Sequence, residues 1–344
     1  MAAPASRRRR TPWWHAYATA LAILVVLDLA LRAWVPHPLR LPEQFSAIYL
    51  ERYVASLRSV HAPVIVMGDS SLWGYKTPAS DSAPAVLARL LPAANFVNLS
   101  YEGGSPVNSE VLLRYLLQAG VRPRLVVFNV NQKEFNPSDS AFKRLRPSLQ
   151  VAAEQELTVR DRAELDLQNR SAVNDRLSDL VARLWALYGY RTDLREALFG
   201  TDDMATLLTH VAGTLSGYTF RQAQAEAPTA ERFLGTYDLT PLDSSNISYQ
   251  RLVALAALLE RAHVPAIGIL TPTNHTLLHD YIDNSVYVAN VATAARMLRS
   301  KGVTTLNLDA AIPAGDFIDN DHLTSEGNRR FAELLRPTIE EALR

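Results

Sequence analysis

Cysteine is absent from this chain of 344 residues. The protein therefore forms no disulfide, has no thiolate nucleophile and holds no cysteine-ligated metal. The same absence leaves the redox compartment undetermined, because disulfides are the usual indicator of an oxidising environment. The location of the protein has to be inferred from other features.

An excess of charge of either sign is also absent. Lysine plus arginine and aspartate plus glutamate are equal, at 35 residues each. A nucleic-acid-binding protein usually carries a basic excess, so neither a nucleic-acid partner nor a strongly acidic substrate is predicted. The sequence has no internal repeat, and its apolar share is that of an ordinary globular protein.

The N-terminus carries the strongest signal for location. Arg7 to Arg10 form a basic cluster, and residues 13–35 are mostly Ala, Leu, Ile and Val. As a helix this run is long enough to cross a bilayer core of about 30 Å. By the positive-inside rule we expect a cytoplasmic N-terminus at residues 1–12 and a single transmembrane anchor at 13–35. The rest of the chain would lie outside the cell inner membrane, in the periplasm or another extracytoplasmic space.

The alternative for this segment is a cleavable signal peptide. The apolar run is long for one, and no clear small-x-small cleavage site precedes Pro36. A carboxylate inside the run, Asp28, is costly in a membrane and is often turned towards a protein partner. Arg32 lies four residues further on the same helical face, so a simple ion pair within the helix is the other interpretation.

Beyond the anchor, apolar runs typical of strands alternate with segments of helical spacing. The predicted strands are residues 63–67, 95–99, 125–130, 266–270 and 304–308, and the predicted helices between and after them are residues 79–91, 110–119, 251–262, 286–301 and 325–343. This order is typical of an α/β fold with a doubly wound parallel sheet.

The strand signals stop in the middle of the chain. Residues 138–246 are rich in charged residues, Ala and Leu, and we expect a mostly helical insertion there. The sheet domain is then formed by residues 60–137 together with 247–344. Residues 36–59 are predicted to be a linker or helix that joins the anchor to this domain.

Two polar motifs lie next to predicted strands or helices of this domain. Gly68-Asp69-Ser70 directly follows the first strand, at the sheet edge where open α/β sheets place their sites. Asp319-Asn320-Asp321-His322 precedes the last helix, which Thr324 is placed to cap. A carboxylate beside an imidazole sets the tautomer of a general base and stabilises its imidazolium, which is what a serine nucleophile needs.

These two motifs resemble those of the SGNH (GDSL-like) hydrolase family, which has a flavodoxin-like α/β fold. In that family a Gly-Asp-Ser block after the first strand supplies the nucleophile, and an Asp-x-x-His block before the final helix supplies its partners. The resemblance implies that Ser70, His322 and Asp319 are catalytic.

The resemblance also implies an oxyanion hole. Its donors would be the backbone N–H of Ser70, a glycine after the second strand and an asparagine after the third. Gly103 and Asn131 match these places, although Gly104 is an alternative to Gly103. Each of these residues also has a purely structural interpretation, as a turn glycine or a loop cap.

The sequence departs from the family pattern in its third block. Asn129 replaces the usual Gly two residues before Asn131, and Gln132 replaces the usual Asp after it. Ser71, beside Ser70, is a second candidate hydroxyl. The resemblance covers the sheet domain and does not explain the insertion.

No metal site and no cofactor are predicted. His275 and His279 are four residues apart, as in some metal sites, but no third ligand is evident and no Glu follows the first His. A polar helix face is the interpretation we adopt for this pair.

The predicted chemistry is acyl transfer through an acyl-enzyme on Ser70. Water as the second nucleophile would make the protein an esterase, and a sugar hydroxyl would make it an O-acyltransferase. The anchor makes the chain resemble the D-alanine transfer protein of lipoteichoic acid synthesis and exopolysaccharide acetylation proteins. That resemblance implies an acylated cell-envelope polysaccharide as substrate and a membrane-bound O-acyltransferase as partner. The alternative is a non-catalytic envelope binding or assembly protein.

Overall fold

We describe the fold from a computed structural model. It describes residues 14–33, 39–139, 144–164, 171–191, 194, 228–233 and 235–344. The predicted basic segment 1–12 lies outside the described residues. So do residues 13, 34 and 35 at the ends of the predicted anchor, residues 36–38 of the predicted linker, and most of residues 192–227 in the predicted insertion.

A five-stranded parallel sheet forms the centre of the molecule. Its strands are β1 (Val64–Met67), β2 (Phe96–Asn98), β3 (Leu125–Val130), β4 (Ala266–Leu270) and β5 (Thr304–Asn307), in the order β2-β1-β3-β4-β5. All five strands lie where the sequence predicts them. The strand order is that of the flavodoxin-like doubly wound fold, so the predicted fold class is confirmed.

The strands are short, rich in apolar residues and, in the centre of the sheet, buried on both faces. Val64 and Val66 of β1 face one apolar core, whereas Ile65 and Met67 face the other. This alternation follows from the two-residue period of a strand. Because both faces are covered, each central strand reads as a continuous apolar run in the sequence.

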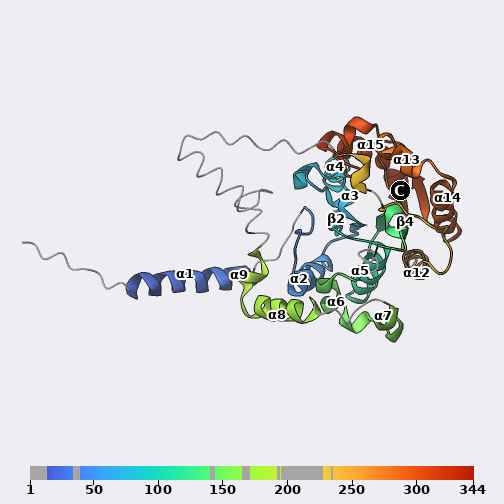
Figure 1. The fold of residues 1–344 in the computed structure, drawn as a ribbon. Coiled ribbons are helices and arrows are strands. Elements are labelled where there is room, and N and C mark those ends of the chain that lie inside the picture. The colour runs from blue at the N-terminus through green and yellow to red at the C-terminus, as the bar shows by residue number, and fades with distance from the viewer. Residues whose placement is uncertain are drawn as a thin grey trace, which may run out of the picture.

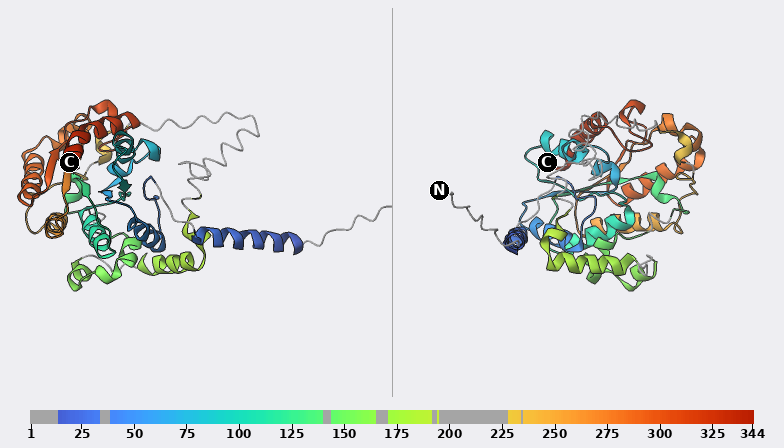
Figure 2. Two further views of the ribbon diagram at one scale, coloured as in Figure 1. Left: turned by 180° about the vertical axis from the view of Figure 1, so that it is seen from behind. Right: turned by 60° about the vertical axis from the view of Figure 1, so that its left-hand side comes forward.

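Helices cover the two faces of this sheet (Figures 1 and 2). The helices on one face are α4 (Ala83–Leu90) and α15 (Ser325–Ala342), and those on the other are α2 (Ala47–Leu57), α5 (Pro106–Gln118), α12 (Ile247–Arg261) and α14 (Ser285–Ser300). The shorter elements of this domain are α3 (Ser70–Trp73), η1 (Ala79–Asp81), η2 (Gln132–Phe135), α13 (His275–Ile282) and η6 (Ala314–Asp316). Tyr49 and Leu50 of α2 are buried in the same core as β1, so the predicted linker segment contributes to the domain.

The described part of residues 138–246 is helical and contains no strand. Its elements are α6 (Pro147–Ala152), η4 (Glu154–Glu156), α7 (Val159–Glu164), α8 (Ser171–Leu184), α9 (Ala186–Gly189) and η5 (Ala230–Phe233). Asp161 of α7 binds Arg114 of α5 at 2.8 Å and Arg251 of α12 at 2.5 Å. These buried ion pairs join the predicted insertion to the sheet domain.

The helix α1 (Trp14–Ala33) projects from the rest of the molecule (Figure 1). It is long and apolar enough to cross a membrane, a test that a signal sequence also passes. Asp28 pairs with Arg32 at 2.7 Å, and the other oxygen of Asp28 accepts the backbone N–H of Leu187 at 3.1 Å. The ion pair expected within this helix is therefore present. A membrane partner at Asp28 stays a prediction.

Candidate active site

The turn that follows β1 presents Ser70 at the carboxyl edge of the sheet. Asp69 caps the short helix α3 by accepting the N–H of Ser71 at 2.9 Å, and Ser70 is the first residue of that helix. A side chain at Gly68 is excluded, because a Cβ there would lie 1.8 Å from the side-chain oxygen of Asn129. The Gly-Asp-Ser sequence thus follows from close packing and from helix capping at this turn.

The loop that carries His322 is held from both ends. Asn274 donates a side-chain hydrogen bond to the carbonyl of Asp319 at 3.1 Å, and Asn320 donates one to the hydroxyl of Tyr237 at 3.0 Å. At the other end Thr324 accepts the N–H of Gly327 at 3.0 Å, which confirms the predicted cap of α15. The loop is therefore anchored on both sides of the histidine.

The structure brings Ser70, His322 and Asp319 together. The Nε2 atom of His322 lies 2.8 Å from the Oγ atom of Ser70, and the Nδ1 atom lies 2.8 and 2.9 Å from the two carboxylate oxygens of Asp319. With a proton on Nδ1 directed at Asp319, Nε2 is left to accept the serine proton. Ser71 does not share this contact, and its hydroxyl has no hydrogen-bond partner among the described residues.

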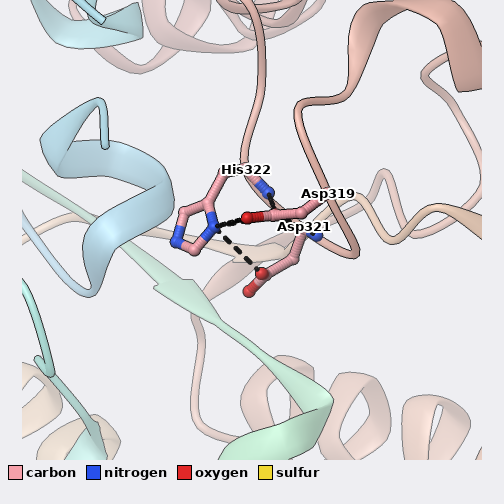
Figure 3. A group of neighbouring side chains, drawn as sticks. All are labelled: Asp319, Asp321 and His322. Atoms are coloured by element: carbon pink, nitrogen blue, oxygen red, sulfur yellow. Dashed lines mark hydrogen bonds and ion pairs between the residues drawn. The ribbon is translucent and has the colours of Figure 1, made fainter. Parts of the chain in front are cut away.

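A second carboxylate, Asp321, lies beside the same imidazole (Figure 3). One of its oxygens is 3.5 Å from Nδ1 of His322, and the other pairs with the ammonium group of Lys133. Burial alone would lower the pKa of His322. The carboxylates of Asp321 and Asp319 outweigh burial, so the net effect is a raised pKa. For Asp319, burial acts to raise the pKa, but the hydrogen bond from His322 outweighs it and lowers the pKa, which keeps this carboxylate ionised.

The two glycines after β2 have different surroundings. The N–H of Gly104 donates to the carbonyl of Tyr101 at 3.1 Å, and a Cβ on Gly104 would lie 2.1 Å from the carbonyl oxygen of Gly68. Gly103 has a φ of +74° and open space around it, and its N–H has no acceptor among the described residues. Gly103 is thus the better oxyanion donor of the two, and Gly104 allows the two loops to approach each other.

Asn131 is completely buried and its amide is already engaged. Its Nδ2 atom donates to Asp321 at 2.6 Å and to Asp69 at 3.0 Å, and its side-chain oxygen accepts the N–H of Lys133 at 3.3 Å. Both amide hydrogens are therefore directed at carboxylates. In this arrangement Asn131 organises the acidic groups beneath the site and has no hydrogen left for an oxyanion, so the geometry does not support the role predicted for it.

Asn129 occupies the place where the family has a glycine. Its amide group donates to Asp69 at 2.7 Å and to the hydroxyl of Thr271 at 3.0 Å, and its oxygen accepts the N–H of Asp69 at 3.1 Å. The side chain thereby fills the space beside Gly68 and connects β1, β3 and β4. The replacement of the usual glycine by Asn129 therefore adds a hydrogen-bond network at the carboxyl edge of the sheet.

One group of residues in the described chain has ligand atoms close enough for a metal ion, namely Asp319, Asp321 and His322. Lys133 already supplies a positive charge to Asp321, and burial of this lysine is outweighed by Asp321 and Asp69, so its pKa is raised and it stays protonated. The donor set therefore fits a hydrogen-bonded proton relay better than a cation site.

The histidine pair of α13 lies outside the serine site. His275 contacts Asp309 at 2.9 Å, and His279 is exposed and pairs with Asp280 and Asp283. The hydrogen bond to Asp309 raises the pKa of His275. Asp283 lies near both histidines, at 3.9 Å from His275 and 3.3 Å from His279, and the two histidines pair with carboxylates on the surface of α13 and its neighbours.

A cleft of about 470 Å³ lies in front of Ser70, within the size range of ligand sites. Backbone glycines and polar or charged side chains form much of its wall, together with two aromatic rings. The lining residues are Asp69, Ser70, Tyr75, Lys76, Glu102, Gly103, Gly104, Lys133, Pro228, Arg232, Phe233, Ile318, Asp319, Asn320 and His322. The ring of Tyr75 also lies against His322, with 4.4 Å between centroids.

Sequence reasoning missed Asp321, Lys133 and Tyr75 as members of this site. Asp321 lies within the Asp-x-x-His block, directly before His322. The sequence therefore contained the signal that a second carboxylate is close to the histidine. Lys133 follows the third strand and therefore also lies at the carboxyl edge of the sheet. No sequence pattern pairs Lys133 with Asp321, because they are far apart in the chain.

Comparison with known proteins gives matches of fold only. No protein-family model matches the sequence, and no curated protein matches it. Among solved structures, the chain is similar to a lipolytic protein of the G-D-S-L family from Desulfitobacterium hafniense, with 12% identity, a TM-score of 0.39, and coverage of 80% of this chain and 99% of that one.

Two further matches are named as an acylhydrolase and as a carbohydrate esterase. An acylhydrolase from Bacteroides fragilis has 12% identity and a TM-score of 0.43, over 88% of this chain and 100% of that one. A family two carbohydrate esterase from Clostridium thermocellum, solved with cellohexaose, has 12% identity and a TM-score of 0.35, over 83% of this chain and 65% of that one.

Proposed function

We propose that this protein is a serine esterase or O-acyltransferase of the SGNH type that acts on an acylated glycan of the cell envelope. The observation that carries the proposal is the chain of contacts from Ser70 Oγ to His322 Nε2 at 2.8 Å and from Nδ1 to Asp319 at 2.8 Å. These residues come from opposite ends of the sequence. Their meeting at hydrogen-bond distances in the order nucleophile, base and carboxylate is what acyl transfer requires.

The proposed reaction has two steps. His322 takes the proton of Ser70 as Oγ attacks the ester carbonyl, and the N–H groups of Ser70 and Gly103 donate to the oxyanion that forms. The imidazolium then gives its proton to the departing alcohol, which leaves an acyl group on Ser70. In the second step His322 deprotonates water or a sugar hydroxyl, this oxygen attacks the acyl carbon, and the proton returns to Ser70.

The cleft supports a hydroxyl-rich substrate. Charged side chains such as Lys76, Glu102 and Arg232 line it and offer hydrogen bonds, while Tyr75 and Phe233 offer aromatic faces on which a sugar ring can lie. A long acyl chain would call for a mostly apolar channel instead. A short acyl group on a polysaccharide fits this lining better.

A test of the proposal is covalent labelling of Ser70. The full-length chain in detergent is treated with a fluorophosphonate probe, alongside Ser70→Ala and His322→Ala. Ser71→Ala is the matched control, because Ser71 is adjacent in sequence and does not contact His322. We expect labelling of the wild type and the control, and loss of labelling in the other two variants. Turnover of an acetyl ester with and without a glycan acceptor then separates transferase from esterase.

A folded wild type that does not label would favour the non-catalytic alternative. The observation that favours this alternative is that both amide hydrogens of Asn131 are bound by carboxylates. The oxyanion hole then lacks the donor that an asparagine would supply. In that case glycan binding by the Ser70→Ala variant, measured by calorimetry, would be the activity to follow.

We further propose that α1 anchors the protein in the cell inner membrane, with the sheet domain on the extracytoplasmic side. The chain has no cysteine, so a single cysteine at exposed Val288 reports topology without background. A membrane-impermeant maleimide is expected to label Val288→Cys in intact spheroplasts. Labelling only after lysis would contradict this orientation.

A further inference from the structure

The helix α8 has its charged and apolar sides reversed relative to an ordinary surface helix. Over residues 177–184, the side facing the protein carries Asp179 and Arg183 together with the small, buried Ala182. Asp179 accepts the N–H of Ile48 at 3.0 Å, and Arg183 pairs with Glu51 at 2.5 Å. Charged groups thus attach α8 to α2, the helix that it lies against.

The opposite side of α8 is apolar and exposed. The exposed fractions are 55% for Leu177, 52% for Leu180, 39% for Val181 and 70% for Leu184, and Trp185 directly after the helix is 46% exposed. The spacing of these residues places them in one stripe along the helix. A contiguous apolar stripe on a surface usually marks a contact with something apolar.

The C-terminal end of this stripe lies beside the C-terminal end of α1. Arg32 donates hydrogen bonds to the carbonyls of Arg183 and Leu184, the last residues of α8. Asp28 accepts the N–H of Leu187 in α9. The end of α8 is therefore attached to the last turns of the apolar helix α1.

The direction of α8 is also informative. In the right-hand view of Figure 2, α1 is seen along its axis while α8 runs across the view. A helix that lies across the axis of a membrane span lies along the membrane surface. Interfacial helices have this orientation, with one apolar side turned into the boundary of the acyl chains.

The length of α1 sets the depth of this contact. From Trp14 to Leu27 a helix spans only about 21 Å, less than the hydrocarbon core of about 30 Å. The whole of α1, with 20 residues, matches that core. The outer boundary of the bilayer then falls at the level of Arg32, where α1 contacts the end of α8. The contact between α9 and Asp28 lies one helical turn deeper.

From these observations we propose that the outer face of α8 lies in the interface of the bilayer that α1 spans, with Leu177, Leu180 and Leu184 against the acyl chains. Trp185 lies where interfacial aromatic residues are favoured. The inference rests on the anchor proposed above. Attachment to the membrane through both α1 and α8 would hold the sheet domain in one orientation relative to the bilayer. The cleft in front of Ser70 would then keep a fixed direction relative to the membrane surface.

The test uses single cysteines in the full-length, cysteine-free chain, each carrying an environment-sensitive fluorophore. The protein is reconstituted in vesicles of phosphatidylethanolamine and phosphatidylglycerol. Leu177→Cys and Leu180→Cys report on α8, Leu24→Cys reports on α1, and Val288→Cys on α14 is the exposed control far from α1 (Figure 1). Circular dichroism of each labelled protein checks that the fold is retained.

We expect nitroxide-labelled lipids to remove most of the fluorescence at Leu177, Leu180 and Leu24, and aqueous iodide to have little effect there. The label at Val288 should show the reverse. If Leu24 is quenched by lipid while the α8 labels behave like Val288, the inference is wrong and the anchor stands.

Two other outcomes also overturn the inference. Labels on α8 that are shielded from iodide but not quenched by lipid would mean that a protein covers this face. A label at Leu24 that is not quenched by lipid would remove the anchor and the interfacial contact together. Labelling of Ser70 by the fluorophosphonate probe is independent of all these outcomes, so failure here is distinct from failure of the proposed chemistry.

Discussion

Two buried clusters of charged side chains lie in the described part of the chain, and they differ in the balance of their charges. The insertion cluster consists of Arg114, Arg251, Glu110 and Asp161. The catalytic cluster consists of Lys133, His322, Asp69, Asp319 and Asp321. The first has two guanidinium groups for two carboxylates, whereas the second has one lysine and one titratable histidine for three carboxylates.

The difference is visible in the pKa values. Burial alone would raise the pKa of Asp161, but hydrogen bonds from Arg114, Thr158 and Arg251 outweigh burial and lower it. In the catalytic cluster the excess of negative charge raises the pKa of His322 in spite of burial. Burial and the charge of Asp69 also raise the pKa of neighbouring Glu134 well above its usual value. A balanced cluster stabilises the fold, and an unbalanced one changes the affinity of a nearby group for a proton.

The largest effect that we predict is on catalysis. Asp319→Asn should lower kcat for a chromogenic acetyl ester by about 10⁴-fold, because the amide favours the wrong imidazole tautomer and does not stabilise the imidazolium. Asp161→Asn, in the insertion cluster, should leave kcat unchanged. A nearly active Asp319→Asn would instead identify Asp321 as the carboxylate that serves His322.

The next effect is on stability and is specific to the insertion cluster. Asp161→Asn leaves Arg114 and Arg251 with too little negative charge, so the free energy of unfolding should fall by about 3 kcal/mol. Denaturation followed by tryptophan fluorescence measures this change. An unchanged stability would show that α7 is not joined to the domain through this cluster.

The pH dependence of stability sharpens the same comparison. A lowered pKa in the folded state means that Asp161 stabilises the wild type above its unfolded-state pKa of about 4, and that this contribution is lost as the pH falls towards the folded pKa. The stability of Asp161→Asn should therefore fall less steeply in acid than that of the wild type. Parallel acid unfolding curves would contradict this expectation.

A smaller effect is predicted for the second carboxylate of the catalytic cluster. Asp321→Asn removes the main charge that raises the pKa of His322, so this pKa should fall. Because the general base works in its neutral form, the acid limb of the kcat/KM profile should move to lower pH. The pH-rate profile of Asp161→Asn provides the matched comparison and should retain the wild-type limb. A limb that moves to higher pH in Asp321→Asn would contradict the assigned electrostatics.

The smallest effect is expected at an exposed cluster. Glu326, Arg329 and Glu333 form ion pairs on the solvent side of α15. Water and salt screen such pairs, so Glu326→Ala should leave the thermal midpoint within experimental error of the wild type. A clear loss of stability would mean that charge balance in the buried clusters is not what distinguishes them.

The sheet of this protein could be predicted from local sequence alone. β3 (Leu125–Val130) and β4 (Ala266–Leu270) begin and end at the predicted residues, because a strand buried on both faces is a short apolar run between polar turns. The predicted helix at residues 79–91 divides into η1 and α4, with Pro84 in the first turn of α4. Proline is favoured at such a start, so Pro84 marks the boundary between the two helices.

The candidate site could be predicted in part. Ser70, His322 and Asp319 were identified from two motifs at opposite ends of the chain, and the structure places them in contact, while their catalytic roles stay a proposal. Asn131 shows the limit of motif reasoning. Its position matches the family pattern, but the direction of its amide depends on Asp69 and Asp321, which compete for the same hydrogens.

The sequence by itself thus determined the strands, the apolar helix α1 and the two motifs that contain the serine and histidine, because each depends on neighbours within a few residues. Only the tertiary structure decided that Lys133 neutralises Asp321, that the N–H of Gly103 has no acceptor among the described residues, and that α8 turns its leucines outward. These features depend on which groups from distant parts of the chain compete for one charge, one hydrogen or one surface. A linear pattern carries no information about that competition.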